Sequence, residues 1–296
     1  MKVAVTGATG VIGTAAVGAL VAAGHDVVAL ARTAEKADRL RTLGATPVRT
    51  SLFDHDGLVE MFTGCEAVCN FATSIPVGFT ASRPGAWREN DRLRTEGVRR
   101  VVAAAREARA RRLVQESVSF LYADNGSEWI TEQSPLEITR ATEPASVGES
   151  HAQQFADGPR TAVVLRFGTI VGDDPLTRWM LRCAEHGRSI GLGDPDGWAH
   201  LVHTEDLGPA VVAALSAPSG VYNVGAEPVR RQELVDGFAV AAGQRSVGFA
   251  GAVLRRLAGP RAEPLTRSLR VCSEHFVAQT GWTPRRATFD PTWFDV

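Results

Sequence analysis

Short apolar runs alternate with helix-length amphipathic stretches through the first half of the chain. The runs are nearly continuous in hydrophobic character and occupy residues 3–5, 27–30, 47–49, 67–71, 113–115 and 162–165. Strands that alternate with helices form right-handed β-α-β units, and strands covered by helices on both faces carry few polar positions. The pattern therefore predicts an α/β fold with a doubly wound parallel sheet.

The first strand runs directly into a glycine turn. Residues 6–13 read TGATGVIG and are followed by a helix-like, alanine-rich stretch. In a dinucleotide-binding turn the first glycine permits a tight turn, the second lets the backbone approach a pyrophosphate, and the third lets the helix pack against the strand. Gly7, Gly10 and Gly13 have this spacing, and the helix that follows presents its N–H groups to an anion. This order of strand, turn and helix predicts a nucleotide site in a Rossmann-type sheet.

The pattern changes after residue 166, where glycine and proline become frequent and the segments shorten. Strand candidates remain at residues 201–203 and 220–224, and helix candidates begin near residues 205 and 231. We expect a small, partly interleaved C-terminal substrate lobe. The predicted dinucleotide-binding domain comprises residues 1–170 and about 198–216, and the lobe comprises about 171–197 and 217–296.

The glycine turn resembles that of the short-chain dehydrogenase/reductase family, and within it the extended, epimerase-like branch. Four later segments match that branch in order and spacing: LRFGTIVG (165–172), HTEDL (203–207), GVYNVG (220–225) and TGWTP (280–284). The resemblance implies that the cofactor lies on the turn and beyond the fourth and sixth strands. Besides the three glycines, the implied contacts are Thr9, Val11, Ile12, Phe71, Ala72, Thr73, Phe167, Gly168 and Thr169.

Charge at the end of the second strand distinguishes two nicotinamide cofactors. An acidic residue there would bind the ribose hydroxyl of NAD, but the strand ends at Arg32, and Lys36 lies one helical turn further on. Two cations suit a 2′-phosphate, so NADP (NADPH) is the expected cofactor and NAD the less favoured one. Asp54, after the third strand, either lies on the adenine side, as the resemblance implies, or caps the helix that follows.

The chain lacks the proton-transfer couple on which the family's usual chemistry depends. That couple is a tyrosine and, four residues later, a lysine, which this spacing places on one helix face. The chain's only tyrosines are Tyr122 and Tyr222, and its only lysines are Lys2 and Lys36. Neither tyrosine is followed by a lysine at the required spacing.

The helix expected to carry the couple covers residues 145–157. Three registers remain open for its two positions: Ala145 and Glu149, Ser146 and Ser150, or Val147 and His151. The last would put a histidine, which titrates near neutrality, in the place of the lysine. The alternative for His151 is a partly exposed residue without a chemical role.

The family's strand-end hydroxyl is altered as well. Counting back from Tyr122 places Val118 at the position of the family's hydroxyl, with Ser117 and Ser119 on either side. Side chains alternate along a strand, so the Ser117 and Ser119 hydroxyls would point to the same face. Glu116 is either an acid or base with a raised pKa or the structural partner of an arginine. Tyr122 is the best single candidate for proton donation, with aromatic packing as its alternative. The predicted catalytic residues are Glu116, Ser117, Ser119, Tyr122 and His151.

The substrate is expected beyond the carboxyl ends of the strands, where open α/β sheets bind their ligands. Candidates for the substrate wall are Ser74, Ile75, Trp87, Trp129, Trp198 and His200. The aromatic side chains favour a small apolar or ring-containing molecule over a heavily charged sugar nucleotide.

The overall composition excludes several classes of partner. The 296 residues are 44% hydrophobic and 22% charged, with a net charge of −1, so nucleic acid and membrane surfaces lack an electrostatic driver. No run is apolar enough to span a bilayer, and no signal peptide is expected before the first strand. Four cysteines without metal-site spacing predict reduced thiols, a cytoplasmic protein and no metal. The resemblance also implies a homodimer through the arginine-rich fourth helix as an alternative to a monomer.

Three functions fit these observations. The preferred one is an NADP-dependent oxidoreductase or epimerase-type enzyme acting on a small organic molecule. The second is a non-redox cyclase, isomerase or lyase that keeps the cofactor as a structural element. The third is a nucleotide-sensing binding protein without catalysis, and the fold alone does not separate the three.

Overall fold

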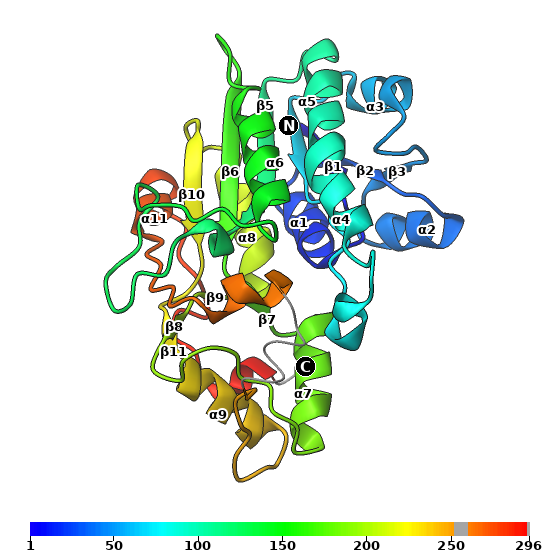
Figure 1. Ribbon diagram of the computed structural model, residues 1–296. Helices are drawn as coiled ribbons and strands as arrows, with labels where there is room; N and C mark the ends of the chain where they lie inside the picture. Colours follow the sequence, from blue (N-terminus) through cyan, green and yellow to red (C-terminus); the bar gives the residue numbers. More distant parts are fainter. Residues whose placement is uncertain (252–259, 295–296) are drawn as a thin grey trace.

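A computed structural model describes residues 1–251 and 260–294 (Figure 1). Its centre is a parallel sheet of seven strands in the order β10-β6-β5-β4-β1-β2-β3, which confirms the predicted doubly wound sheet. The strands are β1 (Lys2–Thr6), β2 (Asp26–Leu30), β3 (Thr46–Val48), β4 (Ala67–Asn70), β5 (Arg112–Val118), β6 (Thr161–Phe167) and β10 (Gly220–Val224). All six strand pairings in this sheet are parallel.

Helices cover both faces of the sheet, because each strand sends alternate side chains to opposite sides. Val3 and Val5 pack into one apolar layer, whereas Ala4 between them packs into the other. The first layer contains α1 (Val11–Ala22), α2 (Ala34–Thr42), α8 (Thr204–Ala214) and α11 (Glu274–Thr280). The second contains α3 (His55–Phe62), α5 (Val98–Glu107) and α6 (Glu143–Gln153).

The fourth helical segment contains a π-helical turn. It comprises α4 (Arg88–Arg92), a π-helical turn (Leu93–Gly97) and α5, without a break between them. The π turn places an arginine, Arg94, in a buried position beside the carboxyl end of β5. Such turns are frequent at functional sites.

A smaller lobe lies beyond the carboxyl ends of the central strands (Figure 1). It has two short sheets, in which β7 (Thr169–Val171) pairs with β9 (Leu201–His203) and β8 (Trp198–Ala199) pairs with β11 (Val229–Arg230). Its helices α7 (Pro175–Glu185) and α9 (Arg231–Ala241) share an apolar core with Trp293 and Phe294. Short 3-10 turns complete the chain: η1 (Gly78–Ser82), η3 (Ser119–Leu121), η4 (Pro260–Thr266) and η5 (Pro291–Phe294).

Three strands differ from the expected domain division. The segment 198–216 was expected in the dinucleotide-binding domain, but its strands β8 and β9 pair with β11 and β7 in the lobe. The segment 217–296 was expected in the lobe, but β10 pairs with β6 and forms the edge of the central sheet. Tyr222 and Val224 of β10 pack into the first apolar layer, and Phe276 of α11 joins them there. The chain therefore returns to the dinucleotide-binding domain before it ends in the lobe.

Two glycines of α1 allow a test of how closely this helix packs. A Cβ atom at Gly13 would lie 2.1 Å from the Gly7 carbonyl oxygen, whereas a Cβ at Gly18 would meet nothing within 4 Å. We expect Gly13→Ala to lower the free energy of unfolding by about 1–3 kcal/mol. Gly18→Ala should raise it by about 0.5–1 kcal/mol, because alanine favours a helix. Guanidinium unfolding of both variants measures this, and equal effects would contradict the packing described.

Candidate functional site

The glycine turn between β1 and α1 is built by close backbone contacts. Gly7 has a φ of +67°, and a Cβ there would lie 2.3 Å from the backbone carbon of Phe71. Gly13 is equally confined, so the protein's own packing requires both glycines. Gly10 differs, because it is exposed, has an extended backbone, and would place a Cβ no closer than 3.4 Å to the Gly7 oxygen. Internal packing therefore does not require a glycine at position 10. The absence of a side chain there leaves the turn accessible to a ligand.

Helix α1 begins at this open turn with its N–H groups uncapped. Gly10 occupies the N-cap position and supplies no side-chain acceptor, and the first turn contains no acidic residue. The first N–H groups of a helix have no acceptor within the helix, and the helix dipole favours an anion there. The N–H groups of Val11, Ile12 and Gly13 therefore fit a pyrophosphate.

Besides Arg41, three cations lie on α2 or directly before it. Arg32 and Arg39 are exposed, and Lys36 is half-buried. Within residues 1–251 and 260–294, none of the three has a carboxylate within ion-pair distance, whereas the neighbouring Arg41 pairs with Asp38 at 2.6 Å. Sequence analysis missed Arg39, although its spacing of three residues from Lys36 is a helical signal.

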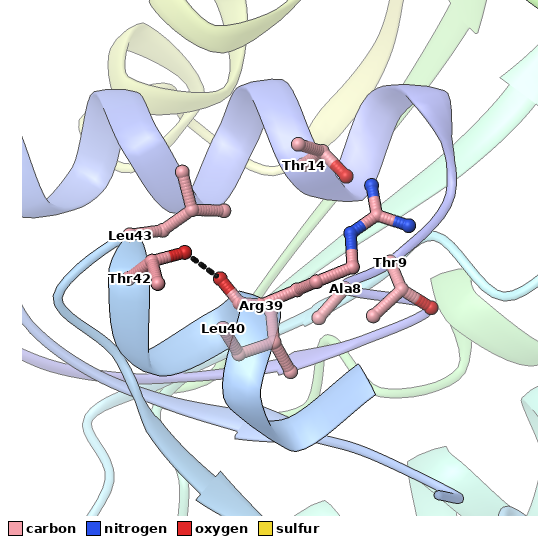
Figure 2. A pocket seen from close by; sticks show the side chains of 7 residues that line it. All are labelled: Ala8, Thr9, Thr14, Arg39, Leu40, Thr42 and Leu43. Carbon is pink, nitrogen blue, oxygen red and sulfur yellow. Dashed lines mark hydrogen bonds between the residues drawn. The ribbon is translucent and has the colours of Figure 1, made fainter. Parts of the chain in front are cut away.

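A pocket of about 120 Å³ separates α1 from α2 (Figure 2). Its lining comprises Ala8, Thr9, Thr14, Arg39, Leu40, Thr42 and Leu43. The Arg39 side chain extends across it toward Thr14 at the start of α1 (Figure 2). The pocket thus joins the glycine turn to the cationic helix.

The residues after β3 and β4 lie at the same edge of the sheet. Asp54 caps α3, since its carboxylate accepts a hydrogen bond from the Gly57 N–H at 3.2 Å. This confirms the capping role, and the adenine-side role stays a prediction. Phe71 is buried behind Gly7, and Ala72 and Thr73 are half-buried.

Two predicted substrate residues follow at this edge. Ser74 and Ile75 are both exposed, as a substrate wall requires. The Ser74 N–H donates a hydrogen bond to the Asn90 side chain at 3.2 Å, which ties this loop to α4.

The end of β6 encloses a histidine that was expected to face the substrate. Phe167 is buried, and the Thr169 N–H donates to the His200 carbonyl oxygen at 2.8 Å. His200 is 2% exposed, because Gly168 and Gly225 leave room for it: a Cβ at Gly225 would lie 2.1 Å from its Nε2 atom. Burial lowers the pKa of His200 to about 3, so its ring is neutral at physiological pH. The expectation that His200 lines the substrate site is therefore wrong.

Helix α6, which should carry the family's couple, holds a buried ion pair. Glu149 accepts two hydrogen bonds from Arg166 of β6, at 2.8 and 2.6 Å, and a third from the Ser117 hydroxyl at 2.5 Å. Both charged side chains are at most 6% exposed. Burial alone would lower the pKa of Arg166, but the hydrogen bonds from Arg166 to Glu149 and the negative charge of Glu149 raise it. Arg166 is therefore held in its charged form, and its hydrogen bonds to Glu149 fix both side chains.

Burial along α6 bears on the three registers left open by the sequence. Ala145 and Glu149 are both buried, whereas Ser150 is exposed and His151 is half-buried. His151 makes no side-chain hydrogen bond within the described part of the chain and does not join the other candidates. The burial pattern favours the register in which Glu149 takes the place of the lysine.

A second buried ion pair lies beside the first. Glu116 pairs with Arg94 of the π turn at 3.1 Å, and both side chains are at most 7% exposed. Burial raises the pKa of Glu116, and the positive charge of Arg94 opposes that shift. Of the two interpretations of Glu116, the geometry supports the structural partner of an arginine.

Tyr122 is fully buried, in contrast to its expected role as a proton donor. Its hydroxyl donates to the Asn223 side chain at 2.8 Å, and the Arg166 guanidinium lies 4.9 Å from its ring centroid. Burial raises the pKa of Tyr122. Ser119 is also fully buried, and it begins a 3-10 turn, so the alternation from Ser117 stops before it. Neither hydroxyl lies open to a ligand in this arrangement.

The three predicted tryptophans of the substrate wall pack against arginines. The contacts join Trp129 to Arg270 at 4.1 Å, Trp198 to Arg270 at 4.6 Å and to Arg230 at 4.0 Å, and Trp87 to Arg261 at 5.2 Å. Trp129 is 51% exposed, and the other two are half-buried. These cation–π contacts hold loops together, and a contact with substrate stays a prediction.

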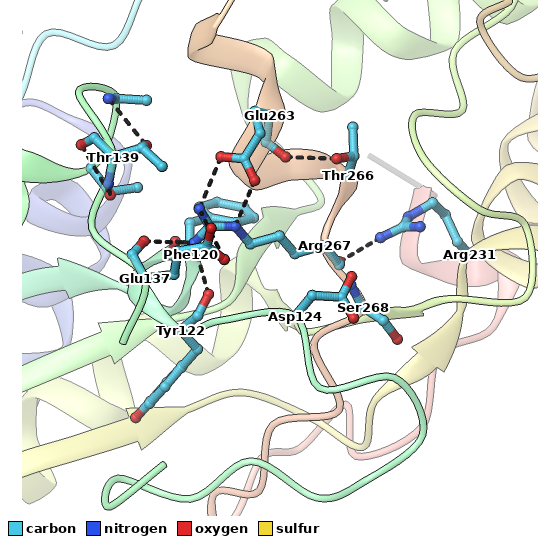
Figure 3. A network of polar contacts seen from close by, with 12 residues as sticks. Phe120, Tyr122, Asp124, Glu137, Thr139, Arg231, Glu263, Thr266, Arg267 and Ser268 are labelled. Atoms are coloured by element: carbon cyan, nitrogen blue, oxygen red, sulfur yellow. Dashed lines mark hydrogen bonds and ion pairs between the residues drawn. The ribbon is translucent and has the colours of Figure 1, made fainter. Parts of the chain in front are cut away.

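A buried arginine that sequence analysis missed connects the lobe to the end of β5 (Figure 3). Arg267 donates hydrogen bonds to the carbonyl oxygens of Tyr122 and Glu137, both at 2.8 Å, and to the Glu263 carboxylate at 2.9 Å. Its own carbonyl oxygen accepts a hydrogen bond from Arg231 at 2.6 Å. This network fixes η4 over the segment that follows β5.

Comparison with known proteins agrees with this geometry. The model of the NAD dependent epimerase/dehydratase family matches residues 3–225. This chain belongs to that family. A curated relative, 3-diazoavenalumate denitrifying reductase of Streptomyces sp, is 30% identical over 311 residues, which cover 100% of this chain and 98% of the relative. Relatives of this epimerase/dehydratase member thus include a named reductase, and a nicotinamide dinucleotide is the cofactor class of the family.

Two solved structures share the fold of this epimerase/dehydratase member. The human epimerase family protein SDR39U1 with NADPH has a TM-score of 0.82 at 22% identity, covering 100% of this chain and 99% of that one. MoeE5 in complex with UDP-glucose and NAD has a TM-score of 0.77 at 24% identity, covering 96% and 94%. Because one contains NADPH and the other NAD, the fold leaves the choice between the two cofactors open.

The described residues add three further findings. None of their helices is long and apolar enough to cross a membrane. They contain no group of histidine, cysteine and acidic side chains that could hold a metal ion. The four cysteines are free thiols.

Burial of His200 predicts a dependence of stability on pH. Its pKa falls from 6.5 to about 3 on folding, so the unfolded chain binds a proton that the folded chain does not. His200 thus stabilises the fold above pH 6.5, and that contribution is lost as the pH falls toward 3, by up to about 1.4 kcal/mol per pH unit. We expect His200→Leu to show a shallower loss of unfolding free energy between pH 6.5 and 5 than the wild type. The surface variant His186→Gln serves as the control, and a His200→Leu slope equal to that of the wild type would contradict the burial.

Proposed function

We propose that this family member is an NADPH-dependent reductase of a small, ring-containing organic molecule. The observation that carries the proposal is the open turn at Gly10, which internal packing does not explain, beside cations without acidic partners. In this proposal the N–H groups of Val11 and Ile12 bind the pyrophosphate. When bound, this cofactor would supply a hydride, and the residues after β4 and β6 would hold its nicotinamide end.

The preference for NADPH follows from charge. Arg32 and Lys36 stand at the N-terminal end of α2, where the helix dipole disfavours cations. A 2′-phosphate would offset this unfavourable placement, and hydrogen bonds to charged groups contribute about 1.5–3 kcal/mol each. We therefore expect NADPH to bind at least tenfold more tightly than NADH, since tenfold corresponds to about 1.4 kcal/mol.

The arrangement of the candidate acid–base side chains favours a substrate that accepts a hydride without also needing a proton from the protein. Glu149, Glu116 and Tyr122 are all held in buried contacts, and the phenol–ammonium couple is absent from the sequence. A ketone gains a proton at oxygen when it is reduced. An arenediazonium group, by contrast, leaves as N₂ when the ring gains a hydride. The Streptomyces relative is named a denitrifying reductase of a diazo compound, 3-diazoavenalumate.

Apolar side chains at the edge of the sheet support a ring-containing substrate. Ile75 and Phe79 follow β4 and are 52% and 67% exposed. Phe79 packs edge-on against Trp179 of α7, with the ring centroids 5.8 Å apart. Exposed apolar groups near a proposed cofactor site are suited to bind an aromatic ring.

Replacement of Gly10 separates cofactor binding from folding. A Cβ at this position lies at ordinary contact distance. Alanine is a poorer N-cap than glycine but lowers the entropy of the unfolded chain, so Gly10→Ala should change the free energy of unfolding by less than about 1 kcal/mol. The same methyl group would stand where the pyrophosphate approaches, so the affinity for NADPH should fall at least tenfold. Calorimetric titration measures both cofactors, with Gly18→Ala as the control variant. Unchanged NADPH binding in Gly10→Ala would defeat the proposed site.

Measuring NADPH oxidation in the wild type and in Tyr122→Phe tests two claims: that the protein is a reductase, and that Tyr122 has a structural role. NADPH absorbance is followed with a panel of arenediazonium salts and ketones, and we expect the diazonium salts to oxidise NADPH faster. Tyr122→Phe removes one buried hydrogen bond and should lower the unfolding free energy by about 1 kcal/mol, with turnover within threefold of the wild type. A large loss of turnover in a folded Tyr122→Phe would restore the phenol as a catalytic group. Bound NADPH that no compound oxidises would favour the nucleotide-sensing alternative.

A further inference from the structure

We infer that Arg261 positions the substrate side of the site by joining η4 to helix α4. The sequence pattern did not single out this residue, which lies 170 residues after its ion-pair partner. The inference deepens the proposed function and rests on it, because the part of the site that Arg261 holds is the one proposed to receive the ring-containing substrate.

Arg261 makes an ion pair between the C-terminal part of the chain and the central domain. Its guanidinium donates two hydrogen bonds to the Asp91 carboxylate of α4, at 3.0 and 2.5 Å. A third hydrogen bond goes to the Ala141 carbonyl oxygen, shortly before α6, at 3.4 Å. A guanidinium that donates to both oxygens of a carboxylate fixes the orientation of the two groups as well as their distance.

Asp91 lies next to the residue that holds the segment after β4. Asn90 precedes it in α4, is 3% exposed, and accepts a hydrogen bond from the Ser74 N–H at 3.2 Å. Ser74 and Ile75 are exposed at the edge proposed for the substrate. Because Asp91 and Asn90 are consecutive residues of one helix, the ion pair that fixes Asp91 also fixes the acceptor of this hydrogen bond.

A second connection runs from Arg261 through Trp87 to η1. The guanidinium carbon lies 5.2 Å from the centroid of the Trp87 ring, within the range of a cation–π contact. The Trp87 Nε1 atom donates a hydrogen bond to the Ala81 carbonyl oxygen of η1 at 2.9 Å. The same turn carries Phe79, which is 67% exposed. Arg261 thus acts on both stretches that are proposed to bind the ring, the residues directly after β4 and η1.

The two ends of η4 are held differently. Arg267, directly after its last residue, has a side chain that is 2% exposed and donates to the carbonyl oxygens of Tyr122 and Glu137 (Figure 3). The Arg261 and Asp91 side chains are 26% and 28% exposed. Partly exposed ion pairs contribute little to global stability, because solvent screens them. Removal of this pair should therefore leave the protein folded and loosen only the parts that it positions.

Hydrogen–deuterium exchange of the full chain measures this positioning directly. In Arg261→Met we expect the backbone amides of residues 74–82 to exchange about fivefold faster than in the wild type, because their supports on α4 and η1 are loosened. The amides of residues 120–123, beside the buried end of η4, should exchange at the wild-type rate.

Two further variants accompany this measurement. Asp91→Asn removes the charge from the other side of the pair and should speed exchange over residues 74–82 in the same way. Arg92→Met is the matched control, because Arg92 pairs with Glu96 at 3.0 Å within the same helical segment and does not join it to η4. Its exchange over residues 74–82 should equal that of the wild type.

Steady-state turnover relates the position of this segment to the substrate. With benzenediazonium as the acceptor, we expect Arg261→Met to raise the KM about fivefold and to keep kcat within about twofold, because the residue acts on substrate binding and not on the reacting atoms. The affinity for NADPH, measured by calorimetry, should change less than about twofold, since the glycine turn lies on other elements. Arg261→Lys, which keeps the charge but loses the planar fork, should give an intermediate KM.

Failure of this inference is distinguishable from failure of the proposed function. Unchanged exchange over residues 74–82 in a folded Arg261→Met, or an equal increase in Arg92→Met, overturns the role of Arg261. An equal loss of affinity for NADPH and for the diazonium salt would indicate a general disturbance and also overturns it. A wild type that oxidises no NADPH with any acceptor overturns the proposed function, and with it the assignment to substrate binding. If Arg261→Met does not fold, Asp91→Asn and Arg261→Lys supply the same comparison.

Discussion

The close approach of three backbone segments at the glycine turn is the constraint on which the site depends. Gly7 lies against the Phe71 backbone and Gly13 lies against Gly7, with no room for a Cβ at either position. These contacts fix β1, β4 and α1 relative to one another. They bring the uncapped start of α1 to the carboxyl edge of the sheet, with the residues after β4 beside it. A side chain at either glycine would separate these elements, and the cationic start of α2 would lose its position next to the turn.

Two buried ion pairs lie on and beside α6, the helix expected to carry the family's usual couple. Removing one charge of such a pair typically costs 3–5 kcal/mol, because its partner stays buried without compensation. Arg166 and Glu149 join β6 to α6, and Arg94 and Glu116 join the π turn to β5. Their net charge is zero, and their hydrogen bonds fix the side chains. These four side chains are committed to structure, and the proposed reaction accordingly takes no proton from them.

The sequence predicted the fold better than the site. Alternating apolar runs located the six strands β1 to β6, and the glycine spacing located the turn, because both signals are local. Pairing of β10 with β6 is not local, so strand propensity alone could not assign it to the central sheet. The burial of His200 depends on the space that Gly168 and Gly225 leave, and that of Tyr122 depends on Asn223, 101 residues away. Arg39 was missed because its side of α2 matters only once α2 packs beside the turn.

The most direct test of this account is a crystal structure of the protein with NADP⁺ bound. The account predicts the pyrophosphate over Gly10 at the start of α1, and the 2′-phosphate beside Arg32 and Lys36. It also predicts that Glu149 remains paired with Arg166, without contact to the nicotinamide ribose. A dinucleotide bound elsewhere, or a Glu149 that leaves Arg166 to contact the ribose, would contradict the account.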